Sequence, residues 1–153
     1  MWSKQEAKDR RVRFFTNFGV YMKKHNEEYG NKMRWVNYRT GVNSVKFRIE
    51  VDNKTAKVCI DITNEDDGIR QLFFEQFEEL RKLLSKSMDD LIWVKDQYLR
   101  SGFAISRIYT KTDEFSMSDE AQWGNLYQFI ERNIVALHEF WDLSQDIFKD
   151  LED

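Results

Sequence analysis

Acidic and basic side chains gather in one short segment, Val45–Asp67 (VKFRIEVDNKTAKVCIDITNEDD), whose alternating apolar residues predict β-structure. Glu50 and Asp61 stand on its two predicted strands, and Lys57 lies between them in the sequence. Carboxylates on neighbouring strands can hold a divalent metal ion that activates water for hydrolysis. The segment is therefore either a catalytic centre or the solvent-facing side of a β-hairpin.

A turn at Asn53-Lys54 predicts a hairpin that satisfies both the apolar and the charged residues of this segment. Side chains alternate along each strand, so the apolar residues of both strands share one face: Val45, Phe47, Ile49, Val51, Ala56, Val58, Ile60 and Ile62. The other face then pairs Glu50 with Lys57 and Lys46 with Asp61. Such cross-strand pairs of opposite charge stabilise a hairpin, so these residues do not require a catalytic role.

The catalytic alternative is a divergent or decayed restriction-endonuclease-like, metal-dependent nuclease. Glu50, Lys57 and Asp61 would form its site, with the acids holding the metal. Such folds place an acid on one strand and a D/E-x-K motif on the next. Here Thr63 stands where the motif after Asp61 requires lysine, so the motif is incomplete. We expect no catalytic residues and no metal ligands, and we retain the nuclease as the alternative.

Other reactive residues lack the spacing of a functional site. His25 and His138 are the only histidines and Cys59 is the only cysteine, a set without the spacing of a zinc site. The sequence has no Gly-rich phosphate loop, and we expect no cofactor. A lone cysteine cannot form an intramolecular disulfide, which favours the cytoplasm. No apolar run is long enough to span a membrane.

Three helices and five strands are predicted to position these residues. The helices are expected at about 3–28, at 65–87 and from 119 onward, each with apolar residues at three- and four-residue spacing. The strands are expected at 33–42, on the two arms of the hairpin, and at 91–99 and 103–111. The order α-βββ-α-ββ-α predicts an α+β fold with an antiparallel meander sheet. The lack of low-complexity linkers predicts a single domain over residues 1–153.

Positive charge is concentrated at the start of the chain. Residues 1–48 hold 12 Lys/Arg against 4 Asp/Glu, although the whole chain has a net charge of −3. Basic residues interleaved with Trp35 and Tyr38 suit nucleic-acid binding. The candidate contacts are Lys4, Lys8, Arg11, Lys23, Lys24, Arg34 and Arg39. In the other interpretation, the basic helix lies against acidic parts of its own domain.

These patterns favour a non-enzymatic interaction module. We expect a macromolecular partner, protein or nucleic acid, with self-association into a homo-oligomer as a further arrangement, and no membrane contact. The sequence does not identify the partner, because charge and aromatic content alone fit several classes of macromolecule.

Five phrases in the sequence together resemble an uncharacterised bacterial family, a domain of unknown function. They are WVNYRTGV (35–42), FRIEVDN (47–53), LFFEQF (72–77), SRIY (106–109) and ALHEFW (136–141). The resemblance covers nearly the whole chain and implies a module found alone or C-terminal to another domain, sometimes a nuclease-like one. Gly41, Glu50, Arg107 and Tyr109 belong to its signatures. The resemblance implies no activity and no ligand.

Among these signature residues, Arg107 has an unusual predicted environment. It shares a strand face with Phe103, Ile105 and Tyr109, so its side chain points toward a mostly apolar surface. A buried arginine requires an acidic partner or an anionic ligand. We expect a structural salt bridge, with an anion site as the alternative.

Overall fold

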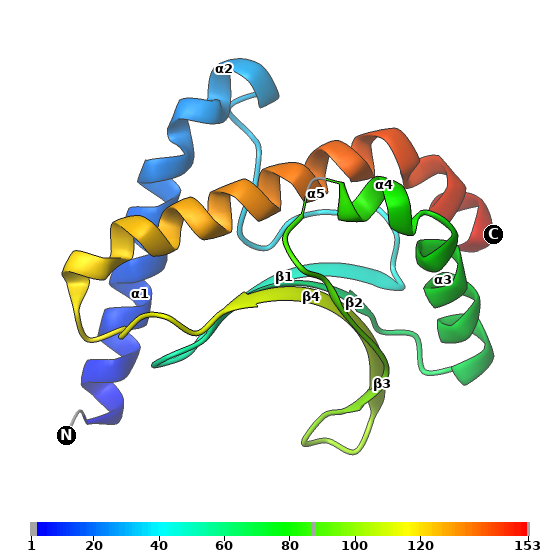
Figure 1. Cartoon of the computed structure of the whole chain (residues 1–153), viewed down its shortest axis with the longest axis horizontal. Coiled ribbons are helices and arrows are strands. Elements are labelled where there is room, and N and C mark those ends of the chain that lie inside the picture. Colours follow the sequence, from blue (N-terminus) through cyan, green and yellow to red (C-terminus); the bar gives the residue numbers. More distant parts are fainter. Residues whose placement is uncertain (1–2, 87, 153) are drawn as a thin grey trace.

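One four-stranded antiparallel sheet organises the chain. The computed structural model describes residues 3–86 and 88–152, and in this part the strands follow the order β1-β2-β4-β3. Their bounds are Val45–Val51 for β1, Ala56–Ile62 for β2, Ile92–Tyr98 for β3 and Ala104–Thr112 for β4. Helix α5 (Trp123–Glu152) runs across one face of the sheet, and no described helix covers the opposite face (Figure 1). The α+β class and the antiparallel pairing are confirmed.

The predicted meander is wrong in strand order. A five-strand meander would keep consecutive strands adjacent, but β4 lies between β2 and β3, and β3 forms an edge of the sheet. The chain leaves β2 through α3 (Asp67–Glu79) and α4 (Arg81–Ser85) before it reaches β3. A connection of this length can pass over one strand position, whereas a tight turn joins only neighbours.

The predicted strand at 33–42 is also wrong. Residues 31–44 form an irregular segment in which Asn37 has a φ of 57° and Gly41 a φ of 77°. Two left-handed backbone positions so close together interrupt an extended strand. The segment still buries Trp35 and Val42, so its apolar residues, which suggested a strand, do serve the core.

The predicted helices are present but divided. The first comprises α1 (Lys4–Tyr21), the 3₁₀ helix η1 (Met22–His25) and α2 (Asn26–Tyr29), and the second is divided into α3 and α4. The 3₁₀ helix η2 (Glu120–Gln122) precedes α5. Ser3 caps α1 by accepting a hydrogen bond from the Glu6 N–H. None of the described helices is long and apolar enough to cross a membrane.

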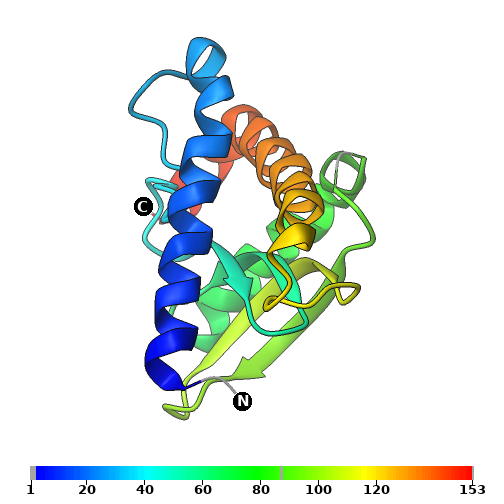
Figure 2. The same ribbon diagram turned by 90° about the vertical axis from the view of Figure 1, so that its left-hand side faces the viewer.

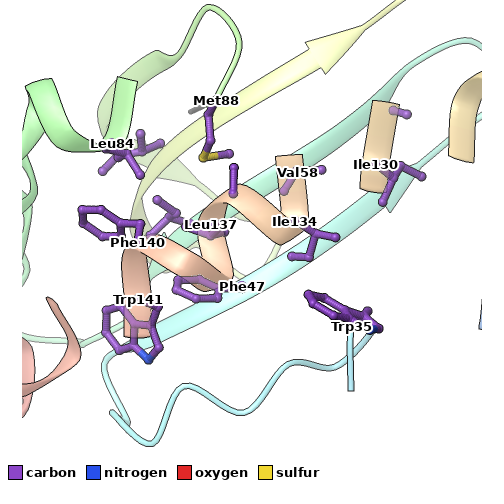
Figure 3. Packing of buried hydrophobic residues seen from close by; sticks show 14 of the residues in the cluster. Trp35, Phe47, Val58, Leu84, Met88, Ile130, Ile134, Leu137, Phe140 and Trp141 are labelled. Atoms are coloured by element: carbon purple, nitrogen blue, oxygen red, sulfur yellow. The ribbon is translucent and has the colours of Figure 1, made fainter. Parts of the chain in front are cut away.

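The hairpin register is confirmed from end to end. Val45 pairs with Ile62 and Val51 with Ala56, which directs the predicted apolar face toward α5. Figure 3 shows Phe47 and Val58 of this face beside α5 residues such as Leu137 and Trp141. The Phe47 and Trp141 rings meet edge to face with centroids 5.2 Å apart. The core therefore lies between the sheet and α5, and the charged face of the hairpin is on the other side.

Helix α1 crosses α5 near the N-terminal end of α5 (Figure 2). Phe14 packs edge to face on Trp123, with ring centroids 5.2 Å apart, and the Tyr127 hydroxyl donates to the Phe14 carbonyl at 2.8 Å. Phe14 and Phe18 are fully buried. This packing fixes which face of α1 remains open to residues 31–36 and to solvent.

Candidate functional site

On the face of the sheet opposite α5, Arg107 joins the two candidate catalytic acids. β2 and β4 are neighbours, and Asp61 faces Arg107 in their register. The guanidinium donates to both oxygens of Asp61, at 2.7 Å and 2.8 Å. It also donates to both oxygens of Glu50, at 2.8 Å and 3.0 Å. One planar group can serve two carboxylates because its five N–H donors form a rigid fork.

The predicted lysine pairs face each other in the backbone register, but the carboxylates turn to arginines instead. Lys46 lies opposite Asp61 and Lys57 opposite Glu50. Arg48 Nη1 donates to Asp61 at 2.9 Å, while the Lys57 ammonium lies 5.2 Å from the centre of the Tyr109 ring. Local register therefore predicts which side chains are near one another but not which of them bind.

This arrangement leaves the acids poorly placed for metal chemistry. Asp61 is fully buried, and Arg48 and Arg107 occupy its oxygens. Burial alone would raise the pKa of Glu50, but the hydrogen bonds from Arg107 together with the positive charges of Arg107, Lys57 and Arg48 hold that pKa below its ordinary value. Among the described residues no three His, Cys, Asp or Glu side chains are grouped to hold a metal ion.

Cys59 lies beside this cluster as an unreactive thiol. It is fully buried, and burial raises its pKa to about 12 despite the nearby Arg107. The nucleophilic form of cysteine is the thiolate, and a thiol with such a pKa stays protonated at neutral pH.

The basic candidates separate into three groups. Arg11, Lys23 and Arg34 border one cavity of about 640 Å³, whose first wall is formed mainly by α1 and η1 and whose second wall is formed by residues 31–36. Lys24 instead binds Glu131 of α5, with Nζ 2.9 Å from Oε2. The remaining candidates are exposed and lie outside the lining of this cavity: Lys4, Lys8 and Arg39.

The cavity is mostly apolar inside and basic at its edge. No acidic residue belongs to the described lining. Trp35, which is 6% exposed, contributes to the wall, and its indole Nε1 has no hydrogen-bond partner in the described structure. The other apolar lining residues are Val12, Phe15, Phe18, Met22, Met33 and Val36.

The sequence does not predict this cavity, because its two walls come from separate segments, one before and one after the end of α2 at Tyr29. One signal was available at Gly19, which lies in the middle of a helix, where glycine is destabilising. A Cβ added at Gly19 would meet no atom within 4 Å, so the missing side chain leaves part of the cavity open. Met33 and Val36 were also missed as wall residues, because they were assigned to a strand.

Comparison with known proteins identifies a family of unknown function. The family model described as domain of unknown function DUF4268 matches residues 10–144. No curated protein and no solved structure matches the chain.

Proposed function

Because the chain belongs to the DUF4268 family, whose description names no activity, we propose a function from the molecule's own geometry. The protein is a non-enzymatic binding module that contacts nucleic acid through basic side chains of α1 and the segment after it. One observation carries this proposal: Arg11, Lys23 and Arg34 border a single cavity, and none of them forms an ion pair within the described chain.

The distribution of ion pairs supports an external partner for these three residues. The acidic part of the chain does neutralise some basic residues of the first helices: Arg13 pairs with Glu120 at 3.2 Å and Lys24 with Glu131. The interpretation in which the basic helix lies against acidic parts of its own domain therefore holds for only part of the basic segment. Unpaired basic side chains at the edge of a cavity attract phosphate groups, which are the dominant contacts in nucleic-acid binding.

The nuclease alternative would require a rearranged sheet face. Glu50 and Asp61 could bind a metal ion only if Arg107 released them, and Lys57 would have to leave Tyr109. An assay with Mg²⁺ or Mn²⁺ tests this alternative directly. Cleavage of DNA that is lost in an Asp61→Ala variant shown by circular dichroism to be folded, but kept in an exposed variant such as Asp90→Ala, would establish the nuclease and overturn the non-enzymatic proposal.

Salt dependence tests the binding proposal. With three phosphate contacts, affinity for single-stranded DNA should fall roughly 20-fold as salt rises from about 50 to about 200 mM. The triple variant Arg11→Ala, Lys23→Ala, Arg34→Ala should lose most of this dependence and at least about tenfold in affinity at the lower salt concentration. Fluorescence anisotropy with a labelled oligonucleotide measures both quantities.

A charge-matched variant controls for non-specific attraction. Lys82, Lys95 and Arg100 are exposed basic residues outside the lining of the cavity, and their triple alanine variant changes the net charge by the same amount. It should bind like the wild type. Equal losses in the two triple variants, or no binding by the wild type, would overturn the proposal.

A further inference from the structure

The cavity between α1 and residues 31–36 is elongated. Its lining on the first wall runs from Arg11 to Asn26, which spans roughly 22 Å at 1.5 Å per helical residue. Arg34 belongs to the facing wall, together with Asn31 and Met33. Its volume of about 640 Å³ lies within the usual range for ligand sites. A small anion could not reach both ends of such a groove, but an extended polymer can follow it.

The inner surface of the groove suits flat apolar groups more than phosphates. Phe15 is half-buried at the wall, and Met33 and Val36 are also only partly covered. Contact between their exposed surface and an aromatic ring would be favourable, because it removes apolar area from water. The charged groups at the edge belong to Arg11, Lys23 and Arg34, so the groove presents cations around an apolar floor.

We propose that this groove binds single-stranded nucleic acid, with unstacked bases on its apolar floor and phosphates at Arg11, Lys23 and Arg34. The inference rests on the proposed function and specifies its ligand. A duplex keeps its bases stacked inside and offers mainly phosphates to such a surface. A single strand can turn its bases into the groove, and every base has a face that packs on apolar and aromatic side chains.

Arg11 and Phe15 also border a second cavity of about 320 Å³, which lies beside the β1–β2 turn. Its lining holds the acids Glu50 and Asp52 as well as Lys57, so its charge is mixed, whereas the described lining of the groove holds basic residues and no acid. The electrostatics therefore place the bound strand in the groove along α1 and not beside the hairpin.

Gly19 offers a test that changes the floor without changing the charge. Because a Cβ there would meet no atom within 4 Å, Gly19→Leu fills part of the groove and replaces glycine with a better helix former. Gly124 of α5 has equally open surroundings and lies outside the groove, so Gly124→Leu is the matched control. Both variants should melt at or above the temperature of the wild type.

The experiment compares three probes of equal length: a thymidine oligonucleotide, the same backbone with abasic sugars, and a duplex. The wild type should bind the thymidine strand at least about tenfold more tightly than the abasic strand, since base stacking contributes strongly to such affinities. Gly19→Leu should remove this preference and leave binding to the abasic strand unchanged. Gly124→Leu should keep the wild-type preference.

Three results would overturn the inference. Equal affinity for all three probes, with the salt dependence retained, would refute base binding but leave the proposed phosphate contacts intact. If Gly19→Leu lost affinity for the thymidine strand and for the abasic strand alike, the apolar floor would not be a binding surface for bases. Polyglutamate that displaces the thymidine strand at equal charge concentration would identify an acidic peptide as the ligand instead. Absence of binding to every nucleic-acid probe would refute the proposed function itself.

Discussion

Arg107 shows how one buried cation can hold three strands together. It extends from β4, its partner Asp61 belongs to β2, and its other partner Glu50 belongs to β1. The arginine side chain is only 3% exposed and Asp61 is fully buried. Charges so far from water are tolerated only when they are paired and hydrogen-bonded. The pairing of Arg107 with Asp61 and Glu50 therefore has a structural explanation that needs no catalysis.

Removing Arg107 should strongly destabilise the fold. Arg107→Met keeps much of the side-chain volume but leaves the buried Asp61 with Arg48 alone, and we expect a loss of about 3–5 kcal/mol in the free energy of unfolding. Urea denaturation followed by circular dichroism measures this loss. Arg100→Ala, at an exposed position, should change stability by less than about 0.5 kcal/mol. A loss in Arg107→Met as small as that of the control would contradict the structural role.

Residues 31–44 show how an element can contribute to the core without regular structure. The Trp141 indole of α5 donates to the Thr40 carbonyl at 2.9 Å, and the Thr40 hydroxyl donates to the Val45 carbonyl at 2.7 Å. Glu152, near the C-terminal end of α5, accepts from the N–H groups of Asn43 and Ser44. Side chains and α5 thus satisfy backbone groups that a strand would have paired with a neighbour.

Gly41 should be the sensitive position of this segment. Its φ of 77° lies in the left-handed region, where an L side chain is strained, although a Cβ would make only an ordinary contact of 3.7 Å with Lys149. We expect Gly41→Ala to cost about 1–2 kcal/mol in the free energy of unfolding. Gly124→Ala is the opposite control, because Gly124 is helical and alanine should be neutral or stabilising there. Thermal denaturation of both variants decides the matter, and an unchanged melting temperature in Gly41→Ala would contradict the expectation.

Across the whole molecule, the uneven charge of the sequence is used in two ways. Part of the basic N-terminal region docks on α5, where Glu131 accepts from the Tyr21 hydroxyl at 2.6 Å and binds His25 at 2.6 Å and Lys24 at 2.9 Å. Arg11, Lys23 and Arg34 border the groove along α1 instead. The two uses are connected, because the docking of α1 on α5 determines which of its side chains face residues 31–36.

The pH dependence of stability should report on this docking. Burial would raise the pKa of Glu131, but hydrogen bonds from Tyr21, Lys24 and His25 outweigh it and hold that pKa below its ordinary value of 4.5. A lowered folded-state pKa means that Glu131 stabilises the fold fully above about 4.5 and that this contribution disappears as pH falls through the lower value. Stability curves from urea denaturation at several pH values measure the effect.

A glutamine variant isolates this contribution. Glu131→Gln should be less stable than the wild type at neutral pH, and the difference should shrink as the pH is lowered below about 4.5. Glu27→Gln, at an exposed position without an ion pair in the described chain, should follow the wild-type curve throughout. A constant difference between Glu131→Gln and the wild type at all pH values would show that the carboxylate charge is not involved.

Much of this fold was predictable from the sequence, because its signals lie between near neighbours in the chain. Alternation around Asn53-Lys54 predicted the register of β1 and β2, and helical spacing predicted the apolar stripe of α5. The strand order was not predictable in this way, since it depends on how a long helical connection packs over the sheet. The pairing of Asp61 with Arg107, 46 residues apart, follows from that order. The position of Arg11, Lys23 and Arg34 around one cavity likewise depends on how α1 docks on α5. Local periodicity therefore determined the elements and their buried faces, whereas long-range packing selected the partners of the charged side chains, because each had several acceptable partners within the sequence.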